Sequence, residues 1–256
     1  MKFTFKLATR LLLSVTPLVT SLVFVASPSF AAAESCANAS MDFSLFSHNP
    51  FEVITDTFTD TFTTTNDGSA QSFANANAEF LTAPLASLTS ASNTANTYAT
   101  GDGNSYLGAA QSFAGLGGYK FNVGAGETFS FNFSTFLDLA TSADNFSTEG
   151  ANSFGQVAFQ IYQNSDTSTT LLDTFFLAGN LNSTSSDDFV NSNSSQYISY
   201  NSKDVSTSFG SGDESIKALF QGNYARSFEN QTYLTLVETK LTQATVGTFD
   251  FLNSLN

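Results

Sequence analysis

The chain has 256 residues, of which 41% are hydrophobic and only 12% are charged, and its net charge is −14 at pH 7. This hydrophobic content excludes wholesale disorder. The acidity excludes nucleic acid and anionic membrane surfaces as expected partners, because binding them depends on Lys and Arg. Phe is abundant at 28 residues and Trp is absent; Ser, Thr, Asn and Gly fill the spaces between the aromatics, a usage typical of β-sheets with polar outer faces.

Residues 1–33 have the pattern of a secretory signal peptide. Three basic residues come first, an apolar stretch follows from Leu11 to Ala26, and three alanines precede the expected cleavage point. We expect cleavage after Ala33, with cleavage after Ala31 as the close alternative. The apolar stretch is shorter than the roughly 20 residues that span a bilayer. We therefore expect a secreted protein, extracellular or periplasmic or at the cell surface, with no membrane insertion of the mature chain.

We expect residues 34–256 to form a single domain, with a short mobile lead at 34–40 and a polar tail at 247–256. Cys36 is the only cysteine, so no internal disulfide can staple the fold. Near a terminus it could form an intermolecular disulfide or have no role. Stability must then come from sheet hydrogen bonds and packed aromatic side chains.

The segment 41–118 is predicted to be mostly extended. Residues 51–65, FEVITDTFTDTFTTT, contain a repeated Asp-Thr-Phe-Thr and many β-branched threonines, which favour a strand. Residues 66–68, Asn-Asp-Gly, predict a turn that ends it. Between 69 and 118 alternating alanines favour a strand, a short helix is the alternative, and residues 100–104 predict a loop.

The pentapeptide AQSFA occurs twice, at residues 70–74 and at residues 110–114. Two equivalent strands of a pseudo-symmetric sandwich would explain the repeat. Coincidence is the alternative, because the composition is strongly biased toward these residues.

Residues 119–139, YKFNVGAGETFSFNFSTFLDL, give the clearest pattern in the chain. Apolar and polar residues alternate on both arms of a predicted β-hairpin, and residues 124–127 supply a glycine-rich turn. The three phenylalanines of 129–133 therefore share one face. We expect them to form the centre of a core, opposed by strands at 157–161 and 234–236.

The remaining chain predicts further strands separated by polar segments. Residues 140–153 read as a polar loop, residues 156–163 and 171–177 as a second hairpin, and residues 180–196 as a long Ser/Asn/Asp loop. Strands are also predicted in three short segments, at residues 197–200, 224–228 and 232–239.

Taken together, these segments predict about ten to twelve short strands. The predicted fold class is all-β: a two-sheet antiparallel β-sandwich, jelly-roll-like in its arrangement. No stretch of the sequence has sustained helical periodicity.

Nucleophilic and zinc catalysis are not indicated by the sequence. His48 is the only histidine and lies in a His-Asn-Pro break beside a predicted strand, and no nucleophile-elbow motif is present. Zinc sites need several thiolate or imidazole ligands, which this composition cannot supply.

Glycoside hydrolysis requires only two carboxylates at a defined separation in a cleft. The absence of Trp weakens this reading, because sugar rings usually lie against broad aromatic faces. We therefore expect no enzyme activity and assign no catalytic, cofactor-binding or metal-binding residue. The carboxylates that could supply such a pair are Asp138, Glu149, Asp187, Asp188, Asp213, Glu214 and Glu238.

Calcium is the most physical alternative among cofactors, because it prefers carboxylate, amide and carbonyl oxygens. Asp102 with Asn104, and Asp187 with Asp188, are the best candidates for such a structural site. The chain has no EF-hand loop and no nonapeptide repeat, and the same residues also form ordinary turns. We therefore expect no cofactor, with structural calcium left open.

Three segments stand out when they are read together: Tyr119–Leu139 with its AGETFSFNF core, Leu172–Phe175, and Tyr224–Glu238 with Arg226, Phe228 and Leu236. Through these segments the chain, over residues 40–246, resembles exported bacterial proteins of the exosortase, or PEP-CTERM, type, including many cyanobacterial ones. The resemblance implies a β-sandwich displayed on or released from the cell surface. Residues 240–256 depart from that type, since they contain no Pro-Glu-Pro, no apolar helix and no basic tail, so release is the expected outcome.

The leading hypothesis is a non-enzymatic extracellular or surface-layer protein with a structural or interaction role. The second hypothesis is a calcium-assisted carbohydrate-binding module that uses Tyr or Phe on an open sheet face. A hydrolase with paired loop carboxylates is the third. Extracellular polysaccharide and surface proteins are the expected partners, and the sequence does not indicate an oligomeric state.

Overall fold

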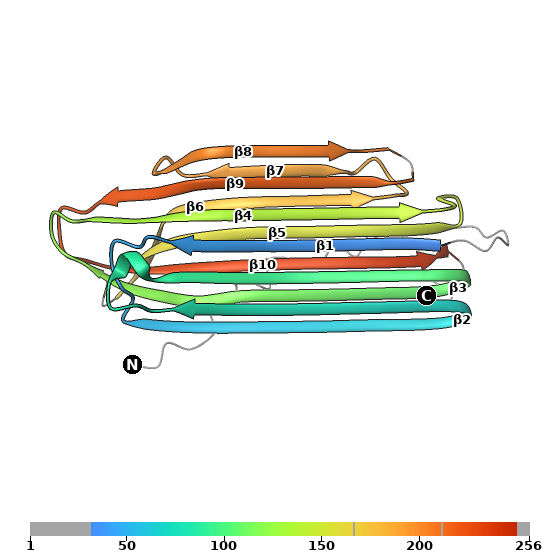
Figure 1. The fold of residues 1–256 in the computed structure, drawn as a ribbon, viewed down its shortest axis with the longest axis horizontal. Coiled ribbons are helices and arrows are strands. Elements are labelled where there is room, and N and C mark those ends of the chain that lie inside the picture. The colour runs from blue at the N-terminus through green and yellow to red at the C-terminus, as the bar shows by residue number, and fades with distance from the viewer. Residues whose placement is uncertain (1–31, 166, 211, 250–256) are drawn as a thin grey trace.

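The computed structural model describes residues 32–165, 167–210 and 212–249, and these form ten β-strands and one short 3₁₀ turn at Ala86–Leu88 (Figure 1). The all-β class is confirmed, and the leader predicted for residues 1–33 lies outside the described residues except for Ala32 and Ala33. The strands are β1 (Ala32–Ser44), β2 (Glu52–Leu81), β3 (Ser90–Val123), β4 (Thr128–Ala143), β5 (Glu149–Asn164), β6 (Thr169–Asn182), β7 (Phe189–Ser194), β8 (Ile198–Ser208), β9 (Glu214–Ser227) and β10 (Thr232–Thr248).

All strands pair antiparallel within one hydrogen-bonded sheet, in the order β7-β6-β5-β10-β3-β1-β4-β9-β8, with β2 on the free edge of β3. β3 takes part in two layers, because residues 91–102 pair with β1 and residues 107–123 pair with β10. Strands that are not hydrogen-bonded neighbours, such as β1 with β5 and β4 with β6, then pack against each other. The sequence predicted two separate sheets; the structure has one sheet whose two halves face each other.

The sheet passes from one layer to the other at a corner in the β2–β3 hairpin. Gly68 pairs with Gly103, and their φ angles are +142° and +111°. A Cβ on Gly68 would lie 2.3 Å from the carbonyl oxygen of Asp102, so the corner requires glycine. The turn predicted at 66–68 and the loop predicted at 100–104 are therefore irregularities inside two continuous strands.

The two AQSFA segments lie in β2 and β3, in opposite layers, and both are strands. Ser72 Oγ donates to the carbonyl oxygen of Phe62 at 3.2 Å, and Ser112 Oγ donates to that of Asn75 at 2.6 Å. Each repeat thus places its serine hydroxyl on the backbone of the facing half of β2. The helix alternative for this region is wrong, because alanine and serine allow the layers to approach closely there.

Aromatic side chains fill the core at the end of the layers near the β3–β4 turn. Phe129, Phe131 and Phe133 are at most 3% exposed, as the hairpin pattern predicts. The Phe159 ring of β5 lies 5.5 Å from that of Phe131 and 5.3 Å from that of Phe133, both edge-on. Burying each ring contributes roughly 1.5–3 kcal/mol, so this cluster is the main apolar contribution to stability.

Small residues fill the opposite end. A second cluster there is mainly alanine, together with Tyr106 and Val246. Ser35 Oγ donates to the carbonyl oxygen of Asn152 and Ser153 Oγ donates to that of Cys36, both at 2.5 Å. These bonds connect β1 and β5 directly across the layers, which only short side chains permit.

Several segments predicted as lead, tail or loop belong to strands. The expected mobile lead 34–40 lies inside β1, and residues 247–248 of the expected tail complete β10; residues 250–256 lie outside the described residues. The predicted loop 140–153 is shorter, because β4 extends to Ala143 and β5 begins at Glu149, and the predicted loop 180–196 contains β7. The predictions of lead, tail and loop were wrong in these places because they relied on the polar composition. Ser, Asn and Ala also occur in strands that lie at a sheet edge or pack against small side chains.

Candidate functional site

The edge strand β2 exposes its first half to solvent. β2 pairs with β3 alone, so the other side of its backbone faces outward. Phe58 and Phe62 are each 54% exposed. They are four residues apart and therefore project from the same face of the strand, with Asp60 between them. Exposed aromatic side chains on a sheet edge mark a surface that is available for binding.

Neighbouring strands continue this edge with apolar residues, although the Phe113 ring of β3 is only 9% exposed. Phe58 lies opposite Phe113 of β3, which lies opposite Leu241 of β10. A Cβ on Gly115 would lie 2.6 Å from Phe113 Cζ, so the Phe113 ring lies flat over this glycine. We define the β2–β10 surface as these apolar residues together with the polar residues of the adjacent register row, namely Phe58, Phe62, Phe113, Leu241, Asp60, Gln111 and Gln243.

The chemistry of the β2–β10 surface suits a neutral polar polymer. Aromatic faces provide apolar contact, while Gln111, Gln243 and Asp60 provide amide and carboxylate hydrogen-bonding groups in the next row. No Lys or Arg belongs to the surface as defined. A polyanion is therefore a poor fit, whereas a chain of sugar rings has both the apolar faces and the hydroxyl groups that these side chains can contact.

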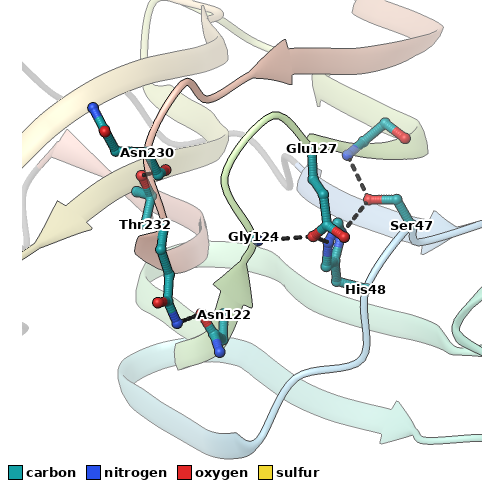
Figure 2. Close-up of polar contacts among 9 residues, drawn as sticks. Ser47, His48, Asn122, Gly124, Glu127, Asn230 and Thr232 are labelled. Atoms are coloured by element: carbon teal, nitrogen blue, oxygen red, sulfur yellow. Dashed lines mark hydrogen bonds and ion pairs between the residues drawn. The ribbon is translucent and has the colours of Figure 1, made fainter.

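The sequence-predicted candidate His48 lies in the loop between β1 and β2, against the β3–β4 turn (Figure 2). Its Nδ1 lies 2.7 Å from Ser47 Oγ and its Nε2 lies 3.0 Å from Glu127 Oε2. Glu127 Oε2 also accepts a hydrogen bond from the Gly124 backbone N–H at 2.7 Å. The bond from His48 and then that from Gly124 lower the pKa of the Glu127 carboxyl.

We interpret this trio as a clamp that holds the 45–51 loop on the turn. Ser47 Oγ accepts a hydrogen bond from the Ser130 backbone N–H at 2.9 Å, so the serine is tied to the first residues of β4. On the same side, Gln231 Nε2 donates to Asn122 Oδ1 at 3.0 Å, which ties the β9–β10 turn to β3. The sequence indicated His48 but not Ser47 or Glu127, because their proximity depends on the hairpin packing.

The predicted catalytic carboxylates are distributed over the molecule. Asp138 lies on the outer face of β4, 3.9 Å from Lys217 Nζ. Glu149 and Glu238 are fully buried at separate places, in the alanine-rich end and on the inner face of β10. A shallow depression of about 380 Å³ over β8 and β9 contains Asp204 as its only acidic lining residue, so it does not hold a carboxylate pair.

One acidic pair is brought together, between the loop after β6 and the start of β9. Burial first and then the neighbouring Asp188 carboxylate raise the pKa of Glu214. Glu214 Oε2 accepts from Thr141 Oγ1 at 3.0 Å, and Asp188 Oδ1 accepts from the Asn182 backbone N–H at 2.8 Å. The Glu214 carboxyl thus joins β9 to β4 through Thr141, and the Asp188 carboxyl orders the loop after β6.

Members of the two candidate calcium pairs make hydrogen bonds to other residues. Asn104 Nδ2 donates to Asp67 Oδ2 at 2.9 Å, across the corner, and Asp187 accepts from Ser185 Oγ at 3.2 Å. Within residues 32–249, leaving aside 166 and 211, no group of three or more His, Cys, Asp or Glu side chains is placed to hold a metal ion.

Cys36 lies within β1, not in a mobile lead. It is partly buried, it pairs with Tyr98 and Ala140 on the flanking strands, and its Sγ accepts from Asn38 Nδ2 at 3.3 Å. Burial raises the pKa of the thiol above its usual value, which disfavours the reactive thiolate.

Comparison of the chain with protein-family models, with curated proteins and with solved structures found no match. None of the helices among the described residues is both long and apolar enough to cross a bilayer.

Proposed function

We propose that this protein is a secreted, non-enzymatic interaction module that binds extracellular polysaccharide through the β2–β10 surface. The observation that carries the proposal is the exposed Phe58–Phe62 pair, which lies on a free edge strand and continues into Phe113 of β3. Exposed aromatic side chains on a free sheet edge favour aggregation, and in soluble proteins such patches commonly mark interaction sites. The proposed setting outside the cell rests on the leader pattern and on the resemblance to exported surface proteins.

Binding by aromatic contact is favoured here over the calcium-assisted form. Asn104, Asp187 and Asp188 make contacts that order turns, as described above. The β2–β10 surface, by contrast, has its two exposed aromatic rings, Phe58 and Phe62, available without an ion. The module should therefore bind in the presence of a chelator.

A hydrolase is less well supported by the geometry. The Ser47 hydroxyl is fixed between His48 and the Ser130 backbone, and the buried carboxyls Glu149 and Glu238 have no exposed surface with which to reach a substrate.

The test is a pull-down on a panel of insoluble polysaccharides, with soluble fragments in a glycan array as the quantitative stage. We expect the Phe58→Ala/Phe62→Ala variant to bind at least about tenfold more weakly, since two exposed aromatic contacts together exceed about 1.4 kcal/mol. Addition of EDTA should leave binding unchanged.

Phe209→Ala is the matched control, because Phe209 is 47% exposed but follows β8, at the far edge from β2. Binding equal to wild type is expected for this variant. Absence of wild-type binding to every polysaccharide, or equal losses in both variants, would overturn the proposal, as would turnover of a bound polymer.

A further inference from the structure

Two oppositely charged side chains and an amide meet in the interior between the layers. Glu238 and Lys240 lie on the inner face of β10 and Asn93 lies on the inner face of β3, and all three have 0% exposed surface. Lys240 Nζ contacts Glu238 Oε1, and Asn93 Nδ2 donates to Glu238 Oε2 at 2.5 Å. One carboxylate therefore holds both the lysine amine and the asparagine amide as neighbours.

The three residues come from opposite halves of the sheet. Asn93 pairs with Met41 of β1, in one layer, while Glu238 and Lys240 pair with Phe159 and Val157 of β5, in the other. The contact between Asn93 and β10 is thus made across the core and not along a hydrogen-bonded ladder. A bond between these side chains would join the layers.

The apolar surroundings favour the neutral forms of the pair. Burial raises the pKa of the Glu238 carboxyl to about 7, against the opposing effect of Lys240. Burial likewise lowers the pKa of the Lys240 ammonium. Removal from water favours transfer of the proton from lysine to glutamate, and a neutral lysine amine is a nucleophile.

The amide carbonyl is free to react. Asn93 Oδ1 is buried without a hydrogen-bond partner, and so is the hydroxyl of Tyr119, whose pKa is raised by burial and by the nearby Glu238 carboxylate. Unpaired buried polar atoms are costly. A donor such as the Tyr119 hydroxyl or protonated Glu238 could stabilise the negative charge that develops on Oδ1 during attack on the amide.

We propose that Lys240 and Asn93 form an intramolecular amide bond, with Glu238 as the proton shuttle. The Nζ lone pair of the neutral amine attacks Asn93 Cγ, and the carbonyl π electrons move onto Oδ1. Glu238 donates its proton to Nδ2 and accepts one from Nζ. The intermediate then collapses: the Nζ–Cγ bond is kept, the Cγ–Nδ2 bond breaks, and ammonia leaves.

The reaction exchanges one amide nitrogen for another, so no atom is oxidised or reduced and no second molecule is consumed. Glu238 ends in the protonation state in which it began. Because both nitrogens contact the same carboxylate, the lysine amine and the asparagine amide are held next to each other, and such proximity favours reaction between them. The product would staple β3 to β10 in a chain whose single cysteine offers no internal disulfide, and heating should unfold it at a higher temperature than the unlinked chain.

The test is mass spectrometry of the intact secreted protein, followed by peptide mapping after trypsin. We expect a mass lower than that of the sequence by one ammonia, no cleavage after Lys240, and a joined peptide pair that contains Asn93 and Lys240. Full mass with cleavage after Lys240 would overturn the proposal. Loss of one water with Lys240 joined to Glu238 would also overturn it.

Variants test the roles of the three residues. Glu238→Gln should keep the full mass, because the shuttle is lost, and Lys240→Arg should also keep it. Asn93→Asp should lose water in place of ammonia and reach the same final mass as the linked wild type. Lys217→Arg, on the outer face of β9, is the control and should still lose ammonia. The wild-type peptide map decides the proposal even where a buried variant does not fold, and ammonia loss in Glu238→Gln would contradict the shuttle.

Discussion

Glu149 is a buried carboxyl whose titration should affect stability near neutral pH. It has no exposed surface, its Oε1 accepts from the Tyr106 hydroxyl at 2.9 Å, and its Oε2 has no partner. Burial raises its pKa from 4.5 to about 7. The folded protein therefore holds this proton at higher pH than the unfolded chain does. Its contribution to stability is full below pH 4.5 and is lost as pH rises toward 7.

Glu149→Gln should remove this part of the pH dependence. Glutamine can still accept from Tyr106 but has no proton to lose, so the fall in melting temperature between pH 5 and pH 7.5 should become smaller than in wild type. The corresponding free energy is on the order of 2–3 kcal/mol. Glu127→Gln is the control, because the pKa of Glu127 is lowered and its titration lies below this window. Equal pH profiles for Glu149→Gln and wild type would contradict the assignment.

Asp173 is the buried anion that joins β6 to β9. Its Oδ2 accepts from the Tyr224 hydroxyl at 2.9 Å and from Arg226 Nη1 at 2.8 Å. Asp173→Ala leaves both donors unpaired. We expect a loss of about 2–3 kcal/mol in the free energy of unfolding, somewhat less than for a fully buried pair because Arg226 is 24% exposed. Urea denaturation at pH 7 measures this loss.

Asp138→Ala is the matched control for that measurement. Asp138 lies 3.9 Å from Lys217, whose side chain is 65% exposed, so its removal should change stability by less than about 0.5 kcal/mol. Losses of equal size in the two variants would show that Asp173 is not a structural anchor.

At the residue level, the buried position of Glu238 and Lys240 could be predicted from the sequence, although no motif marks them. In TYLTLVETK, Glu238 and Lys240 have the same parity as Leu234 and Leu236, so period-two alternation already places them on the inner face. Their partner Asn93 could not be predicted, because the contact crosses between layers and depends on how the sheet turns over. Glu127 was missed for the same reason, since its contact with His48 spans 79 residues.

Among the elements, the β2–β3 corner is the feature on which the layered arrangement depends. Gly68→Ala would place a Cβ 2.3 Å from the Asp102 carbonyl oxygen at a φ of +142°. We expect a loss of about 3–4 kcal/mol, from about 1–2 kcal/mol of backbone strain plus the clash with backbone. Chemical denaturation of the variant measures it.

Gly210→Ala separates backbone strain from the clash. Gly210 has the same φ of +142°, but a Cβ there meets nothing within 4 Å. Its substitution should therefore cost only the strain, about 1–2 kcal/mol. Equal losses in the free energy of unfolding for Gly68→Ala and Gly210→Ala would contradict the close approach of Gly68 to the Asp102 carbonyl oxygen.

The elements that sequence predicted well are those with one buried face. The 119–139 hairpin was predictable because its alternation is set by the aromatic core. The corner was not, since Asn-Asp-Gly at 66–68 is equally compatible with a chain reversal and with a bulge inside a strand. β7 was missed because four of the six residues of this edge strand, FVNSNS, are Asn or Ser, which leaves too little apolar alternation from which to predict it.

At the scale of the whole molecule, the first and last described strands lie in the middle of the sheet order. β1 lies between β3 and β4, and β10 lies between β3 and β5. Sequence position suggested mobile ends, but a terminal segment that pairs on both sides is as well ordered as any other. The fold therefore depends on contacts between distant parts of the chain, which favours slow folding.

The position of β1 also bears on where the leader expected at residues 1–33 would be removed. Ala33 is 1% exposed, pairs with Gly101 and Ala143, and belongs to the alanine-rich cluster, while the Ala32 carbonyl oxygen accepts from the Asp144 backbone N–H at 3.0 Å. Cleavage after Ala33 would remove these contacts and place a charged amino group at the strand end. Cleavage after Ala31, the alternative site, would preserve them.

For a chain whose expected leader is removed on export, we therefore predict that the mature protein begins at Ala32. N-terminal sequencing of the exported protein checks this directly, and a first residue of Glu34 would contradict it. A variant made to begin at Glu34 should be less stable by about 1–2 kcal/mol, since it loses one buried methyl group and the hydrogen bonds of two strand residues. Thermal unfolding of the two chains, one beginning at Ala32 and one at Glu34, measures this difference and tests whether the expected cleavage site is set by the packing of β1 between β3 and β4.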